Sequence, residues 1–184
     1  EIYDRLIFDN KEIPTFFNYP NLYDRLIVLN GWSKTYAMTG WRLGWGVWPK
    51  KLTEHVFKFC VNNHSCVNMP AQYGAIAALD APENHLKEMM EEFSIRRKII
   101  VDGLSSLKGI KCTLPGGTFF VFPNVKDTGM NDEEFAKRCL EEAGVAVIPG
   151  TAFGKFAKNN VRLNFATSKD NISKAIEKID KILK

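Results

Sequence analysis

The chain has 184 residues, of which 45% are hydrophobic and 25% are charged, and its formal net charge is +4. This size and composition are typical of a soluble α/β protein with a core of its own. The basic residues are spread along the chain without an accompanying aromatic groove motif, which argues against nucleic-acid binding. No apolar run approaches the roughly 20 residues that a membrane helix needs.

The first half of the chain predicts two strands joined by a loop, followed by helices. Residues 26–29 form a short apolar run that is typical of a buried strand, and Asn30-Gly31 ends it with turn residues. Thr39-Gly40 marks a second turn, and residues 41–48 are expected to return as a strand. Helical patterns follow over residues 49–61, 71–79 and 82–102.

From Gly103 onward the pattern is that of an α+β module. Asn131 is followed by acidic residues, which predicts a helix start because a cap side chain and the helix dipole favour this order. Gly144 predicts the end of that helix. Strands are expected over residues 110–114, 118–122 and 145–148, and a final helix over residues 171–183.

Lys34 and Arg42 are the most informative pair of side chains for chemistry. Lys34 follows Ser33 just past the first expected strand, and Arg42 comes eight residues later. A lysine amine can form an imine with a carbonyl group, and an arginine can hold two phosphate oxygens with its planar fork. An ordinary surface lysine and a strand arginine are the alternative for these two residues in isolation. The whole pattern of residues 31–44 favours a pyridoxal phosphate site.

This segment resembles the lysine signature of the class I/II aminotransferases, which are fold-type I pyridoxal phosphate enzymes. The form Ser-Lys-Thr-Tyr-Ala-Met-Thr-Gly-Trp-Arg-Leu-Gly-Trp is most similar to the bacterial and archaeal branch of the aspartate aminotransferases. The resemblance implies that Lys34 holds the cofactor as an internal aldimine. It also implies that Ser33 and Arg42 bind the cofactor's phosphate.

Two further segments extend the resemblance. Residues 1–6 are similar to a segment whose tyrosine, here Tyr3, hydrogen-bonds the cofactor's phenolic oxygen. Residues 160–165 are similar to a strand whose arginine, here Arg162, binds the substrate α-carboxylate. Without the resemblance, Tyr3 could be a core aromatic residue and Arg162 a strand arginine with an ordinary partner. The turns at residues 115–120 and 149–154 resemble segments that approach the family's active site, although ordinary tight turns explain them equally well.

The chain matches only the later part of the family pattern. Gly31 stands where many members carry a hydroxyl group, and the aspartate that pairs with the pyridine nitrogen falls one residue before Glu1. The family's glycine-rich phosphate loop and stacking aromatic residue have no counterpart. We therefore expect an α/β fold, the C-terminal part of a fold-type I enzyme. Residues 1–80 then belong to the large cofactor-binding domain, residues 81–102 form an interdomain helix, and residues 103–184 form the small domain.

The resemblance implies an aminotransferase that moves an amino group between an amino acid, aspartate-like by default, and a 2-oxo acid. Pyridoxal 5'-phosphate is the implied cofactor, a cytoplasmic homodimer is the implied form, and this chain alone is expected to be inactive. Neither a nucleic acid nor a membrane is expected as a partner. Two alternatives stay open: a β-eliminating C–S lyase on the same scaffold, and an aminotransferase-like domain that senses a ligand without turnover.

The cysteines predict neither a disulfide framework nor a metal site. Cys60, Cys66, Cys112 and Cys139 show no paired spacing, so reduced thiols are expected. Cys60, His64 and Cys66 could each bind a metal, but their spacing is unusual and no fourth ligand is evident. We therefore predict no metal centre.

Overall fold

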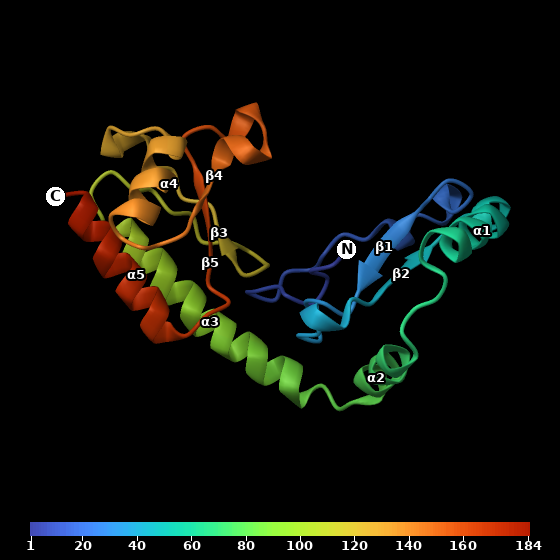
Figure 1. The fold of residues 1–184 in the computed structure, drawn as a ribbon. Coiled ribbons are helices and arrows are strands. Elements are labelled where there is room, and N and C mark those ends of the chain that lie inside the picture. Colours follow the sequence, from blue (N-terminus) through green and yellow to red (C-terminus); the bar gives the residue numbers. More distant parts are fainter. The chain divides into compact units, whose positions relative to one another are not determined.

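The computed structural model describes residues 1–184, which divide into two compact units (Figure 1). The first unit comprises Glu1–Lys87 and the second Glu88–Lys184. The long helix α3 (Asn84–Ser105) begins in the first unit and continues into the second.

The first unit contains an antiparallel pair of strands, β1 (Val28–Gly31) and β2 (Gly44–Val47). The expectation of a strand over residues 41–48 is wrong in its first part. Residues 39–41 form a 3-10 turn, and Arg42 has the left-handed φ of 55°, so the chain reaches extended geometry only at Gly44. Arg42 therefore belongs to the turn before the strand.

Two helices complete the first unit. Helix α1 (Thr53–His64) follows a 3-10 turn at Lys50–Leu52 and buries none of its side chains. Helix α2 (Met69–Asp80) starts at Asn68, whose side-chain oxygen accepts a hydrogen bond from the backbone nitrogen of Ala71 at 3.0 Å. Its small buried residues Ala71 and Ala75 pack against Met38 and Leu43, and this packing supports the turn that carries Arg42.

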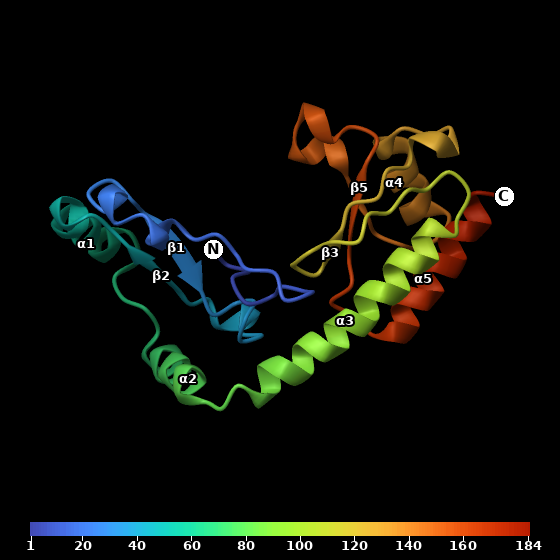
Figure 2. The same cartoon turned by 180° about the vertical axis from the view of Figure 1, so that it is seen from behind.

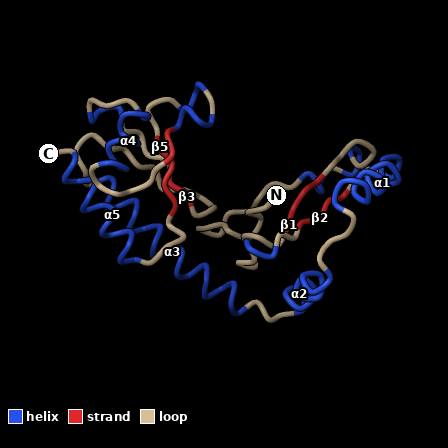
Figure 3. Tube along the Cα trace, in the orientation of Figure 1, coloured by secondary structure: helices blue, strands red, loops and turns tan.

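The second unit packs helices against a small antiparallel sheet (Figures 2 and 3). The strand order is β3-β5-β4, with β5 in the centre. The elements that follow α3 are β3 (Phe120–Val121), α4 (Asp132–Glu141), β4 (Ile148–Pro149), β5 (Val161–Asn164) and α5 (Lys169–Ile182).

The strands of the second unit are shorter than the sequence pattern predicts. Residues 110–114 form no strand, and only an isolated bridge joins Lys111 to Asn124. Thr118 has a φ of 65°, which interrupts the extended chain just before β3. The central strand β5 has four residues, so it offers its neighbours few positions for pairing.

The helix boundaries of the second unit agree with the capping signals. The Asn131 side chain accepts a hydrogen bond from the Glu134 nitrogen at 2.9 Å, which confirms the predicted start of α4. Gly144 follows α4 with a φ of 62°. Ser168 accepts from the Asn171 nitrogen at 3.2 Å, so α5 begins at Lys169, two residues earlier than expected.

The long helices α3 and α5 lie side by side in both views (Figures 1 and 2). The two helices meet at Gly103, where an added Cβ would lie 2.4 Å from the Cδ1 atom of Ile176. The fully buried side chains of this unit include Leu104, Phe135 and Ile179. None of the helices in the chain combines the length and the apolar character required to cross a membrane.

Candidate active site

Ser33 and Lys34 lie in a tight turn directly after β1. The Tyr36 nitrogen donates to the Trp32 carbonyl oxygen at 3.3 Å, and the Ala37 nitrogen donates to that of Lys34 at 3.1 Å. Ser33 and Lys34 are half-buried in this turn. The structure therefore presents an amine and a hydroxyl group next to each other just past a strand end, as the sequence predicts.

Asp4 connects this turn to the N-terminal segment that contains Tyr3. Its Oδ1 atom accepts a hydrogen bond from the Thr35 hydroxyl at 3.0 Å, and its Oδ2 atom accepts one from the Asn30 side-chain amide at 2.9 Å. The Thr35 side chain is only 2% exposed. Because Tyr3 precedes Asp4 and Lys34 precedes Thr35, these bonds hold the two predicted site residues in neighbouring segments. Sequence reasoning missed Asp4, since no local pattern indicates its distant partners.

Arg42 lines an open pocket of about 650 Å³ next to the start of α2. Its Nη1 atom donates to the Thr39 carbonyl oxygen at 2.8 Å, and its side chain is otherwise exposed. The other pocket walls come from the Arg42 turn and from the first turn of α2: Ala37, Gly40, Trp41, Asn68, Pro70 and Ala71. An anion in this pocket would meet a guanidinium and the positive end of a helix dipole.

Gly31 has a physical reason to lack a side chain. An added Cβ would lie 2.7 Å from the carbonyl oxygen of Leu43 and 3.2 Å from the Cα of Gly44. These are backbone atoms at the end of the β1–β2 pair, so they could move only with the strands. A hydroxyl-bearing residue would not fit here without such a shift.

Arg162 projects from the central strand β5 of the second unit, and two aromatic rings flank its guanidinium. The Cζ atom lies 4.5 Å from the ring centre of Phe120 and 4.6 Å from that of Phe153. Such cation–π contacts fix the plane of a guanidinium and leave its N–H edge available. Tyr3, Ser33, Lys34 and Arg42 all lie in the first unit, whereas Arg162 lies in the second.

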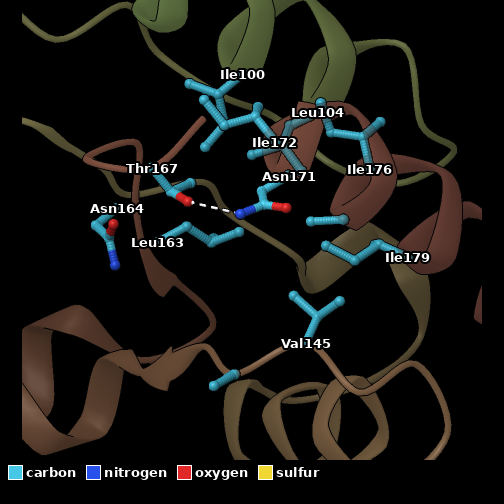
Figure 4. Close-up of a pocket in the computed structure, with 12 residues that line it drawn as sticks. Ile100, Leu104, Val145, Leu163, Asn164, Thr167, Asn171, Ile172, Ile176 and Ile179 are labelled. Atoms are coloured by element: carbon cyan, nitrogen blue, oxygen red, sulfur yellow. Dashed lines mark hydrogen bonds between the residues drawn. The ribbon is translucent and has the colours of Figure 1, made fainter. Parts of the chain in front are cut away.

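A cavity of about 270 Å³ in the second unit holds none of these residues (Figure 4). Five isoleucine and leucine side chains of α3 and α5 line it, together with Leu163 of β5. Its polar end carries Asn164, Thr167 and Asn171, and the Asn171 amide donates to the Thr167 hydroxyl at 3.0 Å. The lining contains no titratable side chain, so we do not assign chemistry to this cavity.

The thiols and the metal-capable residues form no second site. The structure contains no group of three His, Cys, Asp or Glu side chains arranged to hold a metal ion. Burial raises the pKa of the Cys112 thiol to about 11 and that of the Cys139 thiol to about 12. Both therefore stay protonated at neutral pH, and a protonated thiol is a poor nucleophile.

Comparison with known proteins identifies the family. Residues 1–179 match the family model described as aminotransferase class I and II. The chain is 37% identical to the aspartate aminotransferase of Pyrococcus abyssi, over 100% of the chain and 48% of that relative. It is 34% identical to aromatic-amino-acid aminotransferase 2 of Thermococcus litoralis, again over 100% of the chain and 48% of the relative.

Solved structures agree with this match. The crystal structure of an aromatic aminotransferase from Pyrococcus horikoshii has a TM-score of 0.94 at 36% identity, covering 100% of this chain and 49% of that one. The aspartate aminotransferase from Rhizobium meliloti has a TM-score of 0.93 at 32% identity, covering 99% and 48%. The chain belongs to the class I and II aminotransferases, and the expected α/β, fold-type I architecture is confirmed. It spans about half the length of the curated relatives it matches.

Proposed function

We propose that the protein is an aminotransferase in which Lys34 is the catalytic residue and pyridoxal 5'-phosphate is the cofactor. The observation that carries this proposal is the loop between β1 and β2. This loop carries both Lys34 and Arg42, and helix α2 of the same unit packs against it. The loop lies within the part of the chain that matches the aminotransferase family.

The chemistry of the donor set fits pyridoxal phosphate. Arg42 and the start of α2 form a pocket suited to a dianion, and Ser33 adds a hydroxyl donor next to the lysine amine. Since Gly31 has no room for a side chain, Ser33 and Arg42 are the loop residues that would hold the phosphate. Tyr3 would donate a hydrogen bond from its hydroxyl group to the cofactor's phenolic oxygen. When bound, the cofactor supplies an aldehyde carbon and a conjugated ring that accepts electron density from the substrate.

The chain's own residues would then orient the substrate and move one proton. Arg162 would bind the substrate α-carboxylate with its N–H edge, because the Phe120 and Phe153 rings lie against the guanidinium and hold its orientation. The Lys34 amine would take the proton from the substrate Cα and deliver it to the cofactor carbon to which the amino nitrogen is transferred. The Asp4–Thr35 hydrogen bond would keep the Lys34 turn in register with Tyr3 during this transfer.

The amino donor is proposed as an acidic amino acid, with a 2-oxo acid as acceptor. Relatives of similar identity carry the names of aspartate and of aromatic amino acids, so these two classes are the substrates to compare first. The named relatives are aminotransferases, which favours transamination over β-elimination or ligand sensing without turnover. An assay that finds a new oxo acid but no release of ammonia or pyruvate would support transamination over β-elimination.

The domain assignment, the homodimer and the cytoplasmic location are also proposals. We assign residues 1–80 to the large cofactor-binding domain, residues 81–102 to the interdomain helix and residues 103–184 to the small domain. Family membership supports this assignment, and so does α3, which runs from one compact unit into the other.

Borohydride trapping tests the role of Lys34 directly. The whole protein is mixed with pyridoxal phosphate, reduced and mapped by peptide analysis. Specific labelling of Lys34 is expected, and the exposed Lys50 and Lys51 of the same unit serve as internal controls that should stay unlabelled. Substitution Lys34→Ala should lower transamination by at least about 10²–10⁴-fold, the usual contribution of a general acid–base residue. Scattered labelling, or near-normal turnover of the variant, would contradict the proposal.

A further inference from the structure

Asp132, the first residue of α4, is a carboxylate buried at the start of a surface helix. Its side chain is only 1% exposed. The Oδ2 atom accepts hydrogen bonds from the Thr151 backbone nitrogen at 2.9 Å and from the Thr151 hydroxyl at 2.8 Å. The Oδ1 atom accepts one from the Asn159 backbone nitrogen at 3.0 Å. Both oxygens therefore face donors from one other segment of the chain.

That segment is the loop between β4 and β5, and Asp132 holds it at both ends. Thr151 lies in the 3-10 turn Gly150–Phe153 that opens the loop, and Asn159 lies just before β5. Asn159 has a φ of 65°, a backbone conformation that costs energy for a residue other than glycine. A bond from the Asn159 nitrogen to a buried carboxylate is a means of holding that conformation.

The loop in turn carries one of the two rings on Arg162. Phe153 comes two residues after Thr151 in the same 3-10 turn, and its ring centre lies 4.6 Å from the Arg162 Cζ atom. The Phe153 ring also approaches the Phe122 ring edge-on, with 6.0 Å between the ring centres. The second ring on Arg162, that of Phe120, belongs to β3, which pairs with β5 directly. Of the two rings on Arg162, that of Phe153 thus depends on the loop for its position, and that of Phe120 does not.

Stabilisation of α4 alone does not explain the burial of Asp132. Asn131 already caps the helix, and Glu133 and Glu134 supply exposed negative charge in its first turn. A charge removed from water needs compensating bonds, and those of Asp132 come mainly from the loop. Burial alone raises the pKa of the Asp132 carboxyl, but the bonds from Thr151 and Asn159 outweigh it and hold the pKa below its usual value.

We propose that Asp132 is a positioning residue for carboxylate binding: through Thr151 it sets Phe153 against Arg162 and so fixes the plane in which the guanidinium meets a substrate carboxylate. This inference rests on the proposed function, which assigns the substrate carboxylate to Arg162. It adds a residue that touches neither the cofactor nor the substrate. Loss of the hydrogen bonds between Asp132 and the loop should therefore weaken carboxylate binding without changing the chemical step.

The direct readout is the Nε–Hε signal of Arg162 in a proton–nitrogen NMR spectrum of the whole protein. Ring currents from Phe120 and Phe153 shift this signal, and its loss in Arg162→Lys assigns it. In Asp132→Asn, an amide with one acceptor oxygen replaces a carboxylate that accepts three hydrogen bonds from Thr151 and Asn159. The loop should then no longer hold Phe153 against Arg162, and the signal should move toward that of a free arginine. Thr151→Val removes the hydroxyl bond at nearly unchanged volume and should cause a smaller shift in the same direction. Thr151→Ser keeps both bonds and should restore the original position.

Carboxylate affinity provides the second readout, with succinate as the probe because it has neither an amino nor a keto group. The dissociation constant measured by calorimetry should rise about tenfold in Asp132→Asn, the size expected when a charged hydrogen bond is misaligned. In the assay with the amino donor, KM should rise by a similar factor while kcat stays within about twofold, because the interaction is lost equally from the ground state and the transition state.

Asn131→Ala is the matched control for a merely structural role. It removes the cap of the same helix without touching the loop, so it should lower the melting temperature and leave both readouts unchanged. If Asp132→Asn and Thr151→Val leave the Arg162 signal and the succinate affinity at their original values while Arg162→Lys weakens binding, the positioning role is wrong and the proposed function stands. If Arg162→Lys itself leaves succinate binding unchanged, the carboxylate role of Arg162 fails, and this inference fails with it.

Discussion

At the scale of single residues, the hydroxyl group of Thr35 should matter more for stability than its size suggests. It is buried and donates to a carboxylate oxygen of Asp4. Thr35→Val keeps the shape but leaves that acceptor without its partner, so we expect a loss of about 1–3 kcal/mol in the free energy of unfolding. Thr39→Val, an exposed position in the same loop, should change it by no more than about 0.5 kcal/mol. Urea titration of both variants measures the difference, and equal stabilities would refute the role of the Asp4 bond.

A second single-residue prediction concerns pH. The pKa of Asp132 is lowered in the folded protein, because hydrogen bonds from Thr151 and Asn159 outweigh the effect of burial. The unfolded chain therefore takes up this proton first as the pH falls. The stability that Asp132 contributes is complete above about pH 4, the ordinary value for an aspartate, and disappears as the pH falls through the folded value. The difference in unfolding free energy between the wild type and Asp132→Asn should thus shrink below pH 4. A difference that stays constant from pH 7 to pH 3 would contradict this linkage.

At the scale of elements, the contact between α3 and α5 depends on Gly103 and Ile176. An alanine at position 103 favours the helix by about 1 kcal/mol over glycine, but its Cβ would meet the Ile176 Cδ1 atom. Ile176→Val removes that atom at an ordinary cost of about 0.5–1.5 kcal/mol. The double variant should therefore be more stable than the sum of the single effects by at least about 0.5 kcal/mol. Additive effects in a double-mutant cycle would show that the helices do not meet at this pair.

An element could be predicted from the sequence where its boundaries depend on residues close to it along the chain. The helix cap at Asn131 was predictable because a cap depends on residues within one turn, whereas the start of α5 at Lys169 was placed two residues too late. The strand lengths were not, since pairing with β5 decides where β3 and β4 end. In the candidate site, Lys34 and Arg42 could be predicted because they lie in one short segment that resembles the lysine signature of the family. The bonds from Asp4 to Thr35 and from Asp132 to Thr151 join residues 31 and 19 positions apart, and no local pattern indicates them.

At the scale of the whole molecule, the two units bury apolar surface unequally. Helix α1 buries no side chain, and its Phe57 and Phe59 are both 67% exposed. In the second unit, α4 and α5 bury residues such as Phe135, Ile172 and Ile179. Since burial of apolar surface is the main favourable contribution to folding, we expect the first unit to be the less stable one in the chain Glu1–Lys184.

The tryptophans make this difference measurable. All four lie between residues 32 and 48, in the first unit, so tryptophan fluorescence reports on that unit alone, whereas far-ultraviolet circular dichroism reports on the helices of both. In a urea titration of the chain Glu1–Lys184, the fluorescence midpoint should lie below the main dichroism midpoint. Phe135→Ala, at a fully buried site of α4, should cost about 3–5 kcal/mol and lower the dichroism midpoint while leaving fluorescence in place. Phe57→Ala, on the exposed face of α1, should move neither midpoint appreciably. If the two probes have the same midpoint and Phe135→Ala shifts both together, the units unfold as one cooperative body, and the unequal burial has no thermodynamic consequence.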